Sequence, residues 1–79
     1  MKPRYTQKQG QYLAFIYYYT KLNWQAPAYA DFEKYFRAEP SSVNSMIKTL
    51  ESKGFISKER RKARSIKLLL SKEELPELE

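Results

Sequence analysis

The sequence contains no cysteine and no histidine. Without cysteine, neither a disulfide nor a thiolate zinc site can stabilise the fold. Without histidine, the usual general base, the usual metal ligand and every catalytic triad built on imidazole are missing. We therefore expect no metal site and no cofactor.

Glycine is also scarce, because Gly10 and Gly54 are the only two in 79 residues. Two isolated glycines cannot build a phosphate-binding loop, and neither belongs to a GxxxxGK motif. The carboxylates are scattered along the chain, and no pair falls on an interior face. The sequence therefore predicts a protein that is not an enzyme, with no catalytic residues.

Long apolar runs are missing as well. No stretch of about eighteen apolar residues exists, and the first ten residues, "MKPRYTQKQG", lack the apolar core of a signal peptide. Together with the lack of cysteine, this predicts a soluble cytoplasmic protein.

Positive charge, in contrast, is abundant and unevenly distributed. The segment 71–79 holds four glutamates against one lysine, whereas residues 1–70 contain 14 basic and five acidic residues, a net charge of +9. We expect one folded domain over residues 1–70 and an acidic, flexible tail over 71–79. A positive domain indicates a polyanionic partner, either nucleic acid or an anionic membrane, unless the charge only keeps the protein in solution.

Three helices are predicted from caps and apolar spacing. Thr6 and Gln9 form a capping box, and the helix that follows should run to about residue 22 with a stripe of Tyr12, Leu13, Ile16, Tyr19 and Thr20. Pro27 interrupts it, and a short helix is expected over about 28–36. Pro40 suits the first turn of a third helix, whose stripe is Val43, Met46, Ile47 and Leu50.

Two strands should follow the third helix. Gly54 is placed to end that helix in the left-handed conformation. The segments 55–58 and 64–70 then read as strands, joined by a loop over 59–63. Three helices followed by a β-hairpin make a mostly α fold, the winged helix-turn-helix, in which the third helix enters the major groove of DNA.

The exposed face of the predicted third helix has the chemistry of a DNA-reading surface. It presents short hydrogen-bonding side chains with one cation a turn further along: Ser41, Ser42, Asn44, Ser45 and Lys48. Asn can bond adenine through two atoms, Ser can bond any base, and Lys can reach guanine or a phosphate. No acidic residue interrupts this face between positions 40 and 50, whereas an ordinary exposed helix mixes Glu with Lys.

The hairpin carries most of the remaining positive charge. Five of the seven residues from 58 to 64 are basic, and only Glu59 opposes them. Such a loop repels itself unless an external anion lies against it, and Arg or Lys on a hairpin can bond phosphates or the minor groove. The residues predicted to contact the DNA backbone are Lys53, Lys58, Arg60, Arg61, Lys62 and Arg64. The prediction requires that the hairpin tip and the third helix project from the same side.

The sequence also resembles a known family. The stretches "YTQKQGQYLAFIYYYT", "PSSVNSMIKTLESKGFI" and "KARSIKLL" resemble the N-terminal DNA-binding domain of LexA-type repressors over roughly residues 5–69. The resemblance implies a winged helix-turn-helix whose third helix reads operator DNA, through positions that correspond to Ser41, Ser42, Asn44 and Ser45. The family commonly has acidic residues on this face, so Asn44 and Ser45 imply a different operator.

The chain departs from the family in three places. It ends before the second domain, through which LexA proteins dimerise and cleave themselves, so we expect no self-cleavage. Glu33 and Arg37 stand near the places where the family usually has a small residue and a turn glycine, with one residue fewer before Pro40. Tyr17 and Tyr18 replace exposed charged residues, and they are hypothesised to form a weak homodimer or partner face on the first helix.

Two other functions fit the same residues. A winged helix can bind a protein, and the basic tip would then meet an acidic partner. Binding to structured RNA through phosphate contacts is the other alternative, although the aromatic residues fall at core spacing. A membrane-surface role fits least, because no helix pairs a basic face with a bulky apolar one.

Overall fold

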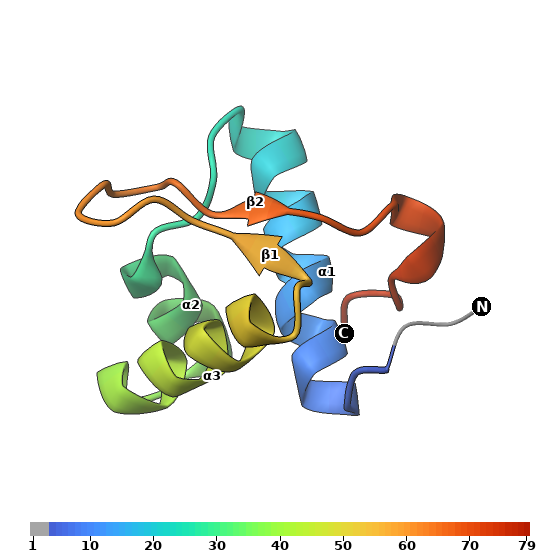
Figure 1. Cartoon of the computed structure of the whole chain (residues 1–79), viewed down its shortest axis with the longest axis horizontal. Coiled ribbons are helices and arrows are strands. Elements are labelled where there is room, and N and C mark those ends of the chain that lie inside the picture. Colours follow the sequence, from blue (N-terminus) through green and yellow to red (C-terminus); the bar gives the residue numbers. More distant parts are fainter. Residues whose placement is uncertain (1–3) are drawn as a thin grey trace.

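The computed structural model describes residues 4–79. Three α-helices come first in the chain: α1 (Gln7–Asn23), α2 (Tyr29–Phe36) and α3 (Pro40–Ser52). An antiparallel hairpin of β1 (Ile56–Ser57) and β2 (Lys67–Leu68) follows, as Figure 1 shows. This order confirms the predicted winged helix-turn-helix. We call residues 58–66, the loop of the hairpin, the wing.

The start of α1 confirms the predicted capping box. The backbone N–H of Gln9 donates to the Thr6 hydroxyl at 3.1 Å, and the Gln9 side chain accepts from the Thr6 N–H at 3.0 Å. The expected stripe holds for Tyr12, Leu13 and Ile16, which are buried, but Thr20 is exposed. Five consecutive residues, 12–16, are buried, because neighbours surround this part of α1.

The helices α2 and α3 form the helix-turn-helix pair. Asp31 caps α2, since its carboxylate accepts from the Ala28 N–H at 2.8 Å. Arg37 ends α2 with a φ of 52°, the left-handed conformation that a glycine adopts at low cost. Pro40 then opens α3 as predicted. An arginine therefore makes the turn of the motif, near the place where the family that the sequence resembles usually has a glycine.

The hairpin leaves α3 through Gly54, whose φ of +79° confirms the predicted helix end. Ile56 pairs with Leu68 and Ser57 with Lys67, so each strand has only two residues. Both strands are shorter than predicted, and at the start of the second one Arg64 adopts a φ of 54°, which interrupts the extended conformation there.

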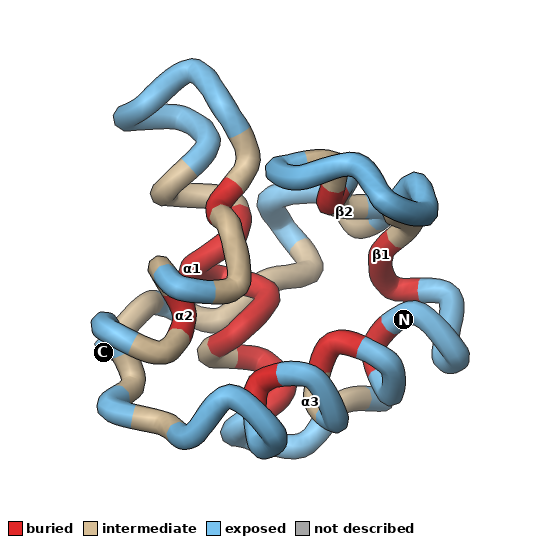
Figure 2. Tube along the Cα trace, turned by 90° about the vertical axis from the view of Figure 1, so that its left-hand side faces the viewer, coloured by how far each residue is buried: buried red, intermediate tan, exposed pale blue. Residues whose placement is uncertain are grey.

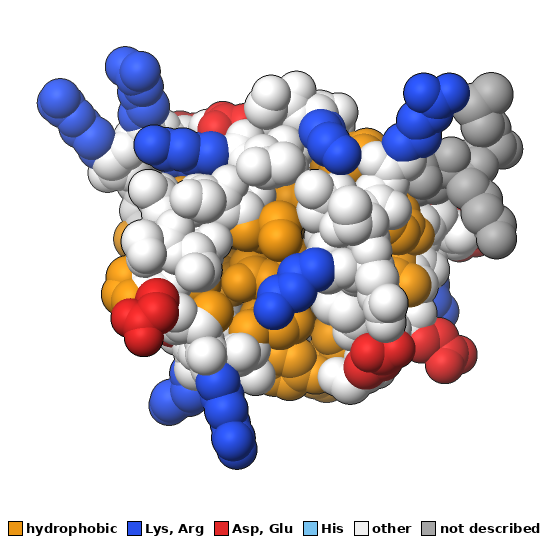
Figure 3. All heavy atoms as spheres, turned by 90° about the horizontal axis from the view of Figure 1, so that it is seen from below, with side chains coloured by type: hydrophobic (Ala, Val, Ile, Leu, Met, Phe, Trp, Pro, Cys, Tyr) orange, Lys and Arg blue, Asp and Glu red, His pale blue; other side chains and the backbone are white. Residues whose placement is uncertain are grey.

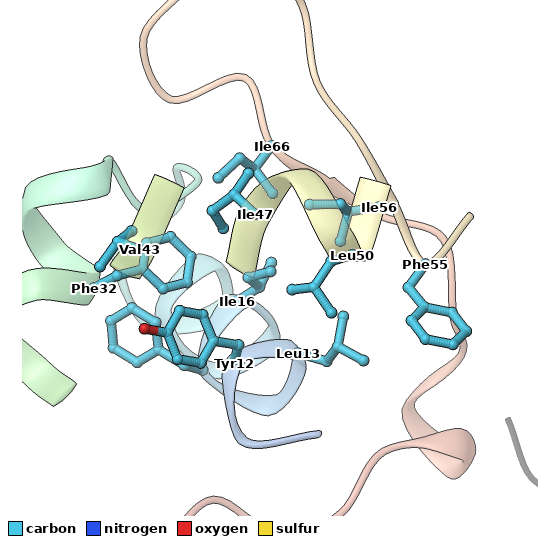
Figure 4. Packing of buried hydrophobic residues seen from close by; sticks show 11 residues of the cluster. Tyr12, Leu13, Ile16, Phe32, Val43, Ile47, Leu50, Phe55, Ile56 and Ile66 are labelled. Atoms are coloured by element: carbon cyan, nitrogen blue, oxygen red, sulfur yellow. The ribbon is translucent and has the colours of Figure 1, made fainter. Parts of the chain in front are cut away.

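The core lies where the three helices and the base of the hairpin meet. Figure 4 shows side chains from α1, α2, α3 and the hairpin converging on it, and in Figure 2 the buried segments line the centre of the molecule. Four elements thus share one cluster, whose labelled members are Tyr12, Leu13, Ile16, Phe32, Val43, Ile47, Leu50, Phe55, Ile56 and Ile66.

The segment 71–79 differs from the flexible tail that the sequence suggested. It forms a short 3₁₀ helix, η1 (Lys72–Glu74), and its leucines, Leu75 and Leu78, pack against the core. Gln11 on α1 binds it twice, donating to the carbonyl of Glu77 at 2.8 Å and accepting from the N–H of Glu79 at 2.7 Å. The apolar residues between the glutamates account for this docking.

Within residues 4–79, no helix is long and apolar enough to cross a membrane.

Candidate nucleic-acid interface

The exposed face of α3 carries all five residues predicted to read DNA. Val43, Ile47 and Leu50 are completely buried, so helical geometry turns the other positions outward. Ser41, Ser42, Asn44, Ser45 and Lys48 are all exposed. Among residues 4–79, no hydrogen bond uses their side chains, which leaves these groups available to a ligand.

A shallow groove separates α3 from the start of α1. Its lining is polar apart from Met46, and comprises Gln9, Ser41, Ser42, Ser45, Met46 and Thr49. The Thr49 hydroxyl donates to the Ser45 carbonyl at 3.0 Å, and at the far end Lys53 Nζ donates to Gln9 Oε1 at 3.3 Å. Lys53, which we predicted to contact the DNA backbone, therefore also ties the end of α3 to α1.

The wing is a closed loop with a basic tip. The Ser65 hydroxyl accepts from the Glu59 N–H at 3.0 Å and donates to the Glu59 carbonyl at 3.2 Å, which holds the two sides of the loop together. Lys62 forms an exposed ion pair with Glu59 at 3.3 Å. Arg60 and Arg61 are exposed and form no hydrogen bond or ion pair within the described residues. Lys58 is half-buried at the base of the wing.

Arg64 is placed differently from the other basic residues of the wing. Its guanidinium donates to the Tyr19 hydroxyl at 3.2 Å, to the Ala26 carbonyl at 3.1 Å and to the Asp31 carboxylate at 3.1 Å. The hydrogen bond to Tyr19 is the first cause that raises the pKa of Arg64 above its ordinary value, and the charge of Asp31 adds to it. Sequence reasoning missed these contacts, because the partners lie 33 to 45 residues earlier in the chain.

The wing and α3 project from the same side of the molecule. In Figure 1 the tip of the hairpin (orange) and the amino-terminal end of α3 (yellow-green) both point to the left. Figure 2 looks at that side and shows both at the front, coloured as exposed. Seen from below in Figure 3, Lys and Arg side chains gather at the corner where the hairpin tip lies. One ligand could therefore lie against both elements.

The aromatic residues of α1 form a separate surface. Tyr17 and Tyr18 are half-buried with rings 5.1 Å apart, and Lys21 lies over the Tyr17 ring. Beyond them Leu22 and Trp24 are 77% and 92% exposed, and nothing in the sequence pattern had indicated Trp24. The dimer or partner face at Tyr17 and Tyr18 stays a prediction.

Two curated proteins match this chain over most of its length. One, from Thermosipho melanesiensis, is 33% identical over 70 residues, which cover 89% of the chain; the other, from Thermosipho africanus, is 33% identical over 64 residues, or 81%. Both are named LexA repressor. The chain is similar to LexA repressors. This confirms the resemblance found in the sequence.

The similarity to LexA repressors concerns one part of those proteins. The chain spans about a third of their length, 35% and 32% respectively, consistent with a match to the N-terminal domain alone. No protein-family profile matches the chain.

Proposed function

We propose that this chain is a transcription regulator that binds double-stranded DNA, with α3 in the major groove and the wing on the adjacent backbone or minor groove. The observation that carries the proposal is the shared orientation of two unlike surfaces. The amino-terminal end of α3, whose exposed side chains form no hydrogen bond within residues 4–79, and the tip of the wing, whose Arg60 and Arg61 have no partner in the same range, lie on the same side of the molecule (Figure 1). The similarity to two LexA repressors supports it.

The face of α3 supplies the sequence-reading part. Ser41, Ser42, Asn44 and Ser45 stand on the first turns, where a recognition helix contacts base edges. The Asn44 amide can donate to and accept from one adenine, and the serine hydroxyls can bond several bases. Lys48 lies one turn further along, within reach of a guanine or a phosphate.

The wing supplies affinity that does not depend on sequence. Arg60 and Arg61 have no partner among the described residues, so a phosphate would relieve their mutual repulsion. Lys62 adds a third cation, because its exposed ion pair with Glu59 is weak and easily exchanged. These contacts position the protein on the duplex, whereas α3 selects the sequence.

Selection from a pool of random duplexes with the purified chain tests the proposal. We expect one enriched motif, and a palindromic motif would indicate two-fold assembly. Gel retardation with that duplex then measures the variants. Asn44→Ala should cost about 1–3 kcal/mol on the selected site and relax preference at one base pair. Lys72→Ala removes a charge on η1, on the opposite side of the molecule from the wing tip (Figure 1), and is the control expected to bind normally.

Two results would replace the proposal by an alternative. No retardation of any duplex at low salt would favour a module that binds an acidic protein. Tighter binding to structured RNA than to duplex DNA in direct competition would favour the RNA alternative. An equal loss on every sequence from Asn44→Ala would contradict direct reading by α3.

A further inference from the structure

Arg64 connects the wing to three separate parts of the helical body. Its Nη1 atom lies 3.2 Å from the hydroxyl of Tyr19 on α1 and 3.1 Å from the carbonyl of Ala26 in the loop after α1. The same atom lies 3.1 Å from the carboxylate of Asp31 on α2. The Arg64 side chain is 36% exposed, so solvent reaches the residue, but its guanidinium lies against these three groups of the body.

Asp31 couples this contact to the helix-turn-helix pair. The Oδ2 atom that accepts from Arg64 also accepts from the Ala28 N–H at 2.8 Å, the bond that caps α2. Because α2 packs against α3, a single carboxylate oxygen links the wing to the helix pair that contains the reading face. The position of the wing relative to α3 therefore depends on this pair.

The backbone at Arg64 supports the same reading. Its φ of 54° is left-handed, a conformation that costs free energy for any residue other than glycine. Such a conformation persists where surrounding contacts determine it, and the three hydrogen bonds of the side chain provide those contacts. Arg61 adopts a similar φ without such partners within residues 4–79, so the role of Arg64 rests on its side-chain contacts and not on its φ alone.

We propose that Arg64 is a positioning residue, which holds the wing in its DNA-binding orientation through Asp31, and is not a phosphate contact. The proposal rests on the proposed function and changes the role that the sequence suggested for this residue. A wing that is already fixed loses less conformational entropy when DNA binds. The Arg64–Asp31 pair would thus strengthen binding without touching the ligand.

The substitution Asp31→Asn should change the affinity for DNA in opposite directions, depending on whether Arg64 positions the wing or contacts a phosphate. This substitution removes a negative charge near the wing, so simple electrostatics predicts tighter binding to DNA. If Asp31 holds Arg64, the ion pair is replaced by a weaker hydrogen bond to a neutral amide oxygen, and binding should weaken, by about threefold to tenfold. The asparagine still offers an oxygen to the Ala28 N–H, which preserves the cap of α2. Glu59→Gln is the matched control, because it makes the same change of charge on the wing and leaves Arg64 alone.

Two measurements test the proposal. In the free protein, backbone ¹⁵N order parameters of residues 58–65 should fall in Arg64→Ala and in Asp31→Asn, and stay unchanged in Arg60→Ala. On the selected duplex, Asp31→Asn should bind more weakly than the wild type and Glu59→Gln at least as tightly. The double variant Asp31→Asn with Arg64→Ala should bind no worse than Arg64→Ala alone, since the two residues act together.

Three results would overturn the positioning role: tighter binding by Asp31→Asn, additive losses in the double variant, or order parameters that do not change in Arg64→Ala. Circular dichroism tests whether each variant is folded. If Arg64→Ala is unfolded, Arg64→Lys takes its place. Failure of the wild type to bind any duplex overturns the proposed function instead. The order parameters, measured without DNA, then still decide whether Arg64 holds the wing.

Discussion

The salt dependence of DNA binding can be estimated from the cations that the structure leaves free. Lys48 on α3 and Arg60 and Arg61 on the wing have no partner within residues 4–79, and Lys62 has only an exposed ion pair. If three or four of these neutralise phosphates, the slope of log affinity against log salt is about −0.9 per contact, or roughly −2.7 to −3.6. Raising the salt from about 50 to 200 mM should then weaken binding about 40- to 150-fold.

The assay is fluorescence anisotropy on the selected duplex, titrated at five or more concentrations of potassium chloride. Arg60→Ala and Arg61→Ala should each make the slope shallower by about 0.9, because each removes one phosphate contact. Arg64→Ala should lower the affinity and leave the slope unchanged, since its guanidinium already binds Asp31. Lys72→Ala makes the same change in net charge on η1, which lies on the opposite side of the molecule from the wing tip (Figure 1), and should change neither quantity.

A wild-type slope shallower than about −1 would refute the reasoning, because fewer than two phosphates would then be neutralised. An unchanged slope in both Arg60→Ala and Arg61→Ala would refute only the assignment of phosphate contacts to these two arginines. In that case the cations that bind DNA lie elsewhere, and the wing has another use.

Three further predictions concern the folded body and its aromatic surface. Gly10→Ala should destabilise the protein, because the added Cβ would lie 2.8 Å from the ring of Tyr5 and 3.0 Å from Pro76. Overpacking costs about 1–3 kcal/mol, which exceeds the gain in helix propensity of up to about 1 kcal/mol, so we expect a net loss of about 1 kcal/mol in the free energy of unfolding in urea. A stabilised variant would contradict this prediction. Burial raises the pKa of Tyr12, so this tyrosine ionises first in the unfolded chain as the pH rises, and the free energy of unfolding should fall above about pH 10. The free energy of unfolding of Tyr12→Phe should fall less steeply between about pH 9.5 and 11. Identical pH profiles for the two proteins would contradict this prediction. Tyr18→Glu should abolish any self-association of the wild type in sedimentation at high concentration, and unchanged behaviour removes the partner face on α1.

The helices and the exposed face of α3 could be predicted because their signals are local. The capping box spans four residues, from Thr6 to Gln9, and the stripe of α3 repeats within three turns. Burial of Val43, Ile47 and Leu50 then determines which side chains face outward, whatever the rest of the fold does. The exposure of Asn44 and its neighbours follows from that pattern alone.

The contacts of Arg64 could not be predicted, because its partners are distant in the sequence. In the sequence it is one of five similar charges, and nothing beside it identifies Tyr19 or Asp31 as partners. The same holds for the segment 71–79, whose glutamates suggested a solvated tail. Tyr5 donates to the Glu74 carbonyl across 69 residues at 2.6 Å, and such a contact has no local pattern.

The docked C-terminal segment also separates the charges of the molecule. Four of the nine acidic residues belong to residues 71–79. Figure 1 places η1, within that segment, on the right of the molecule, whereas the basic tip of the wing lies on the left. A molecule with such a dipole turns its basic side toward a polyanion before contact, which raises the rate of productive encounters. A freely moving acidic tail could instead reach the wing and compete with phosphates, so the docking of 71–79 on α1 keeps the proposed DNA-binding surface open.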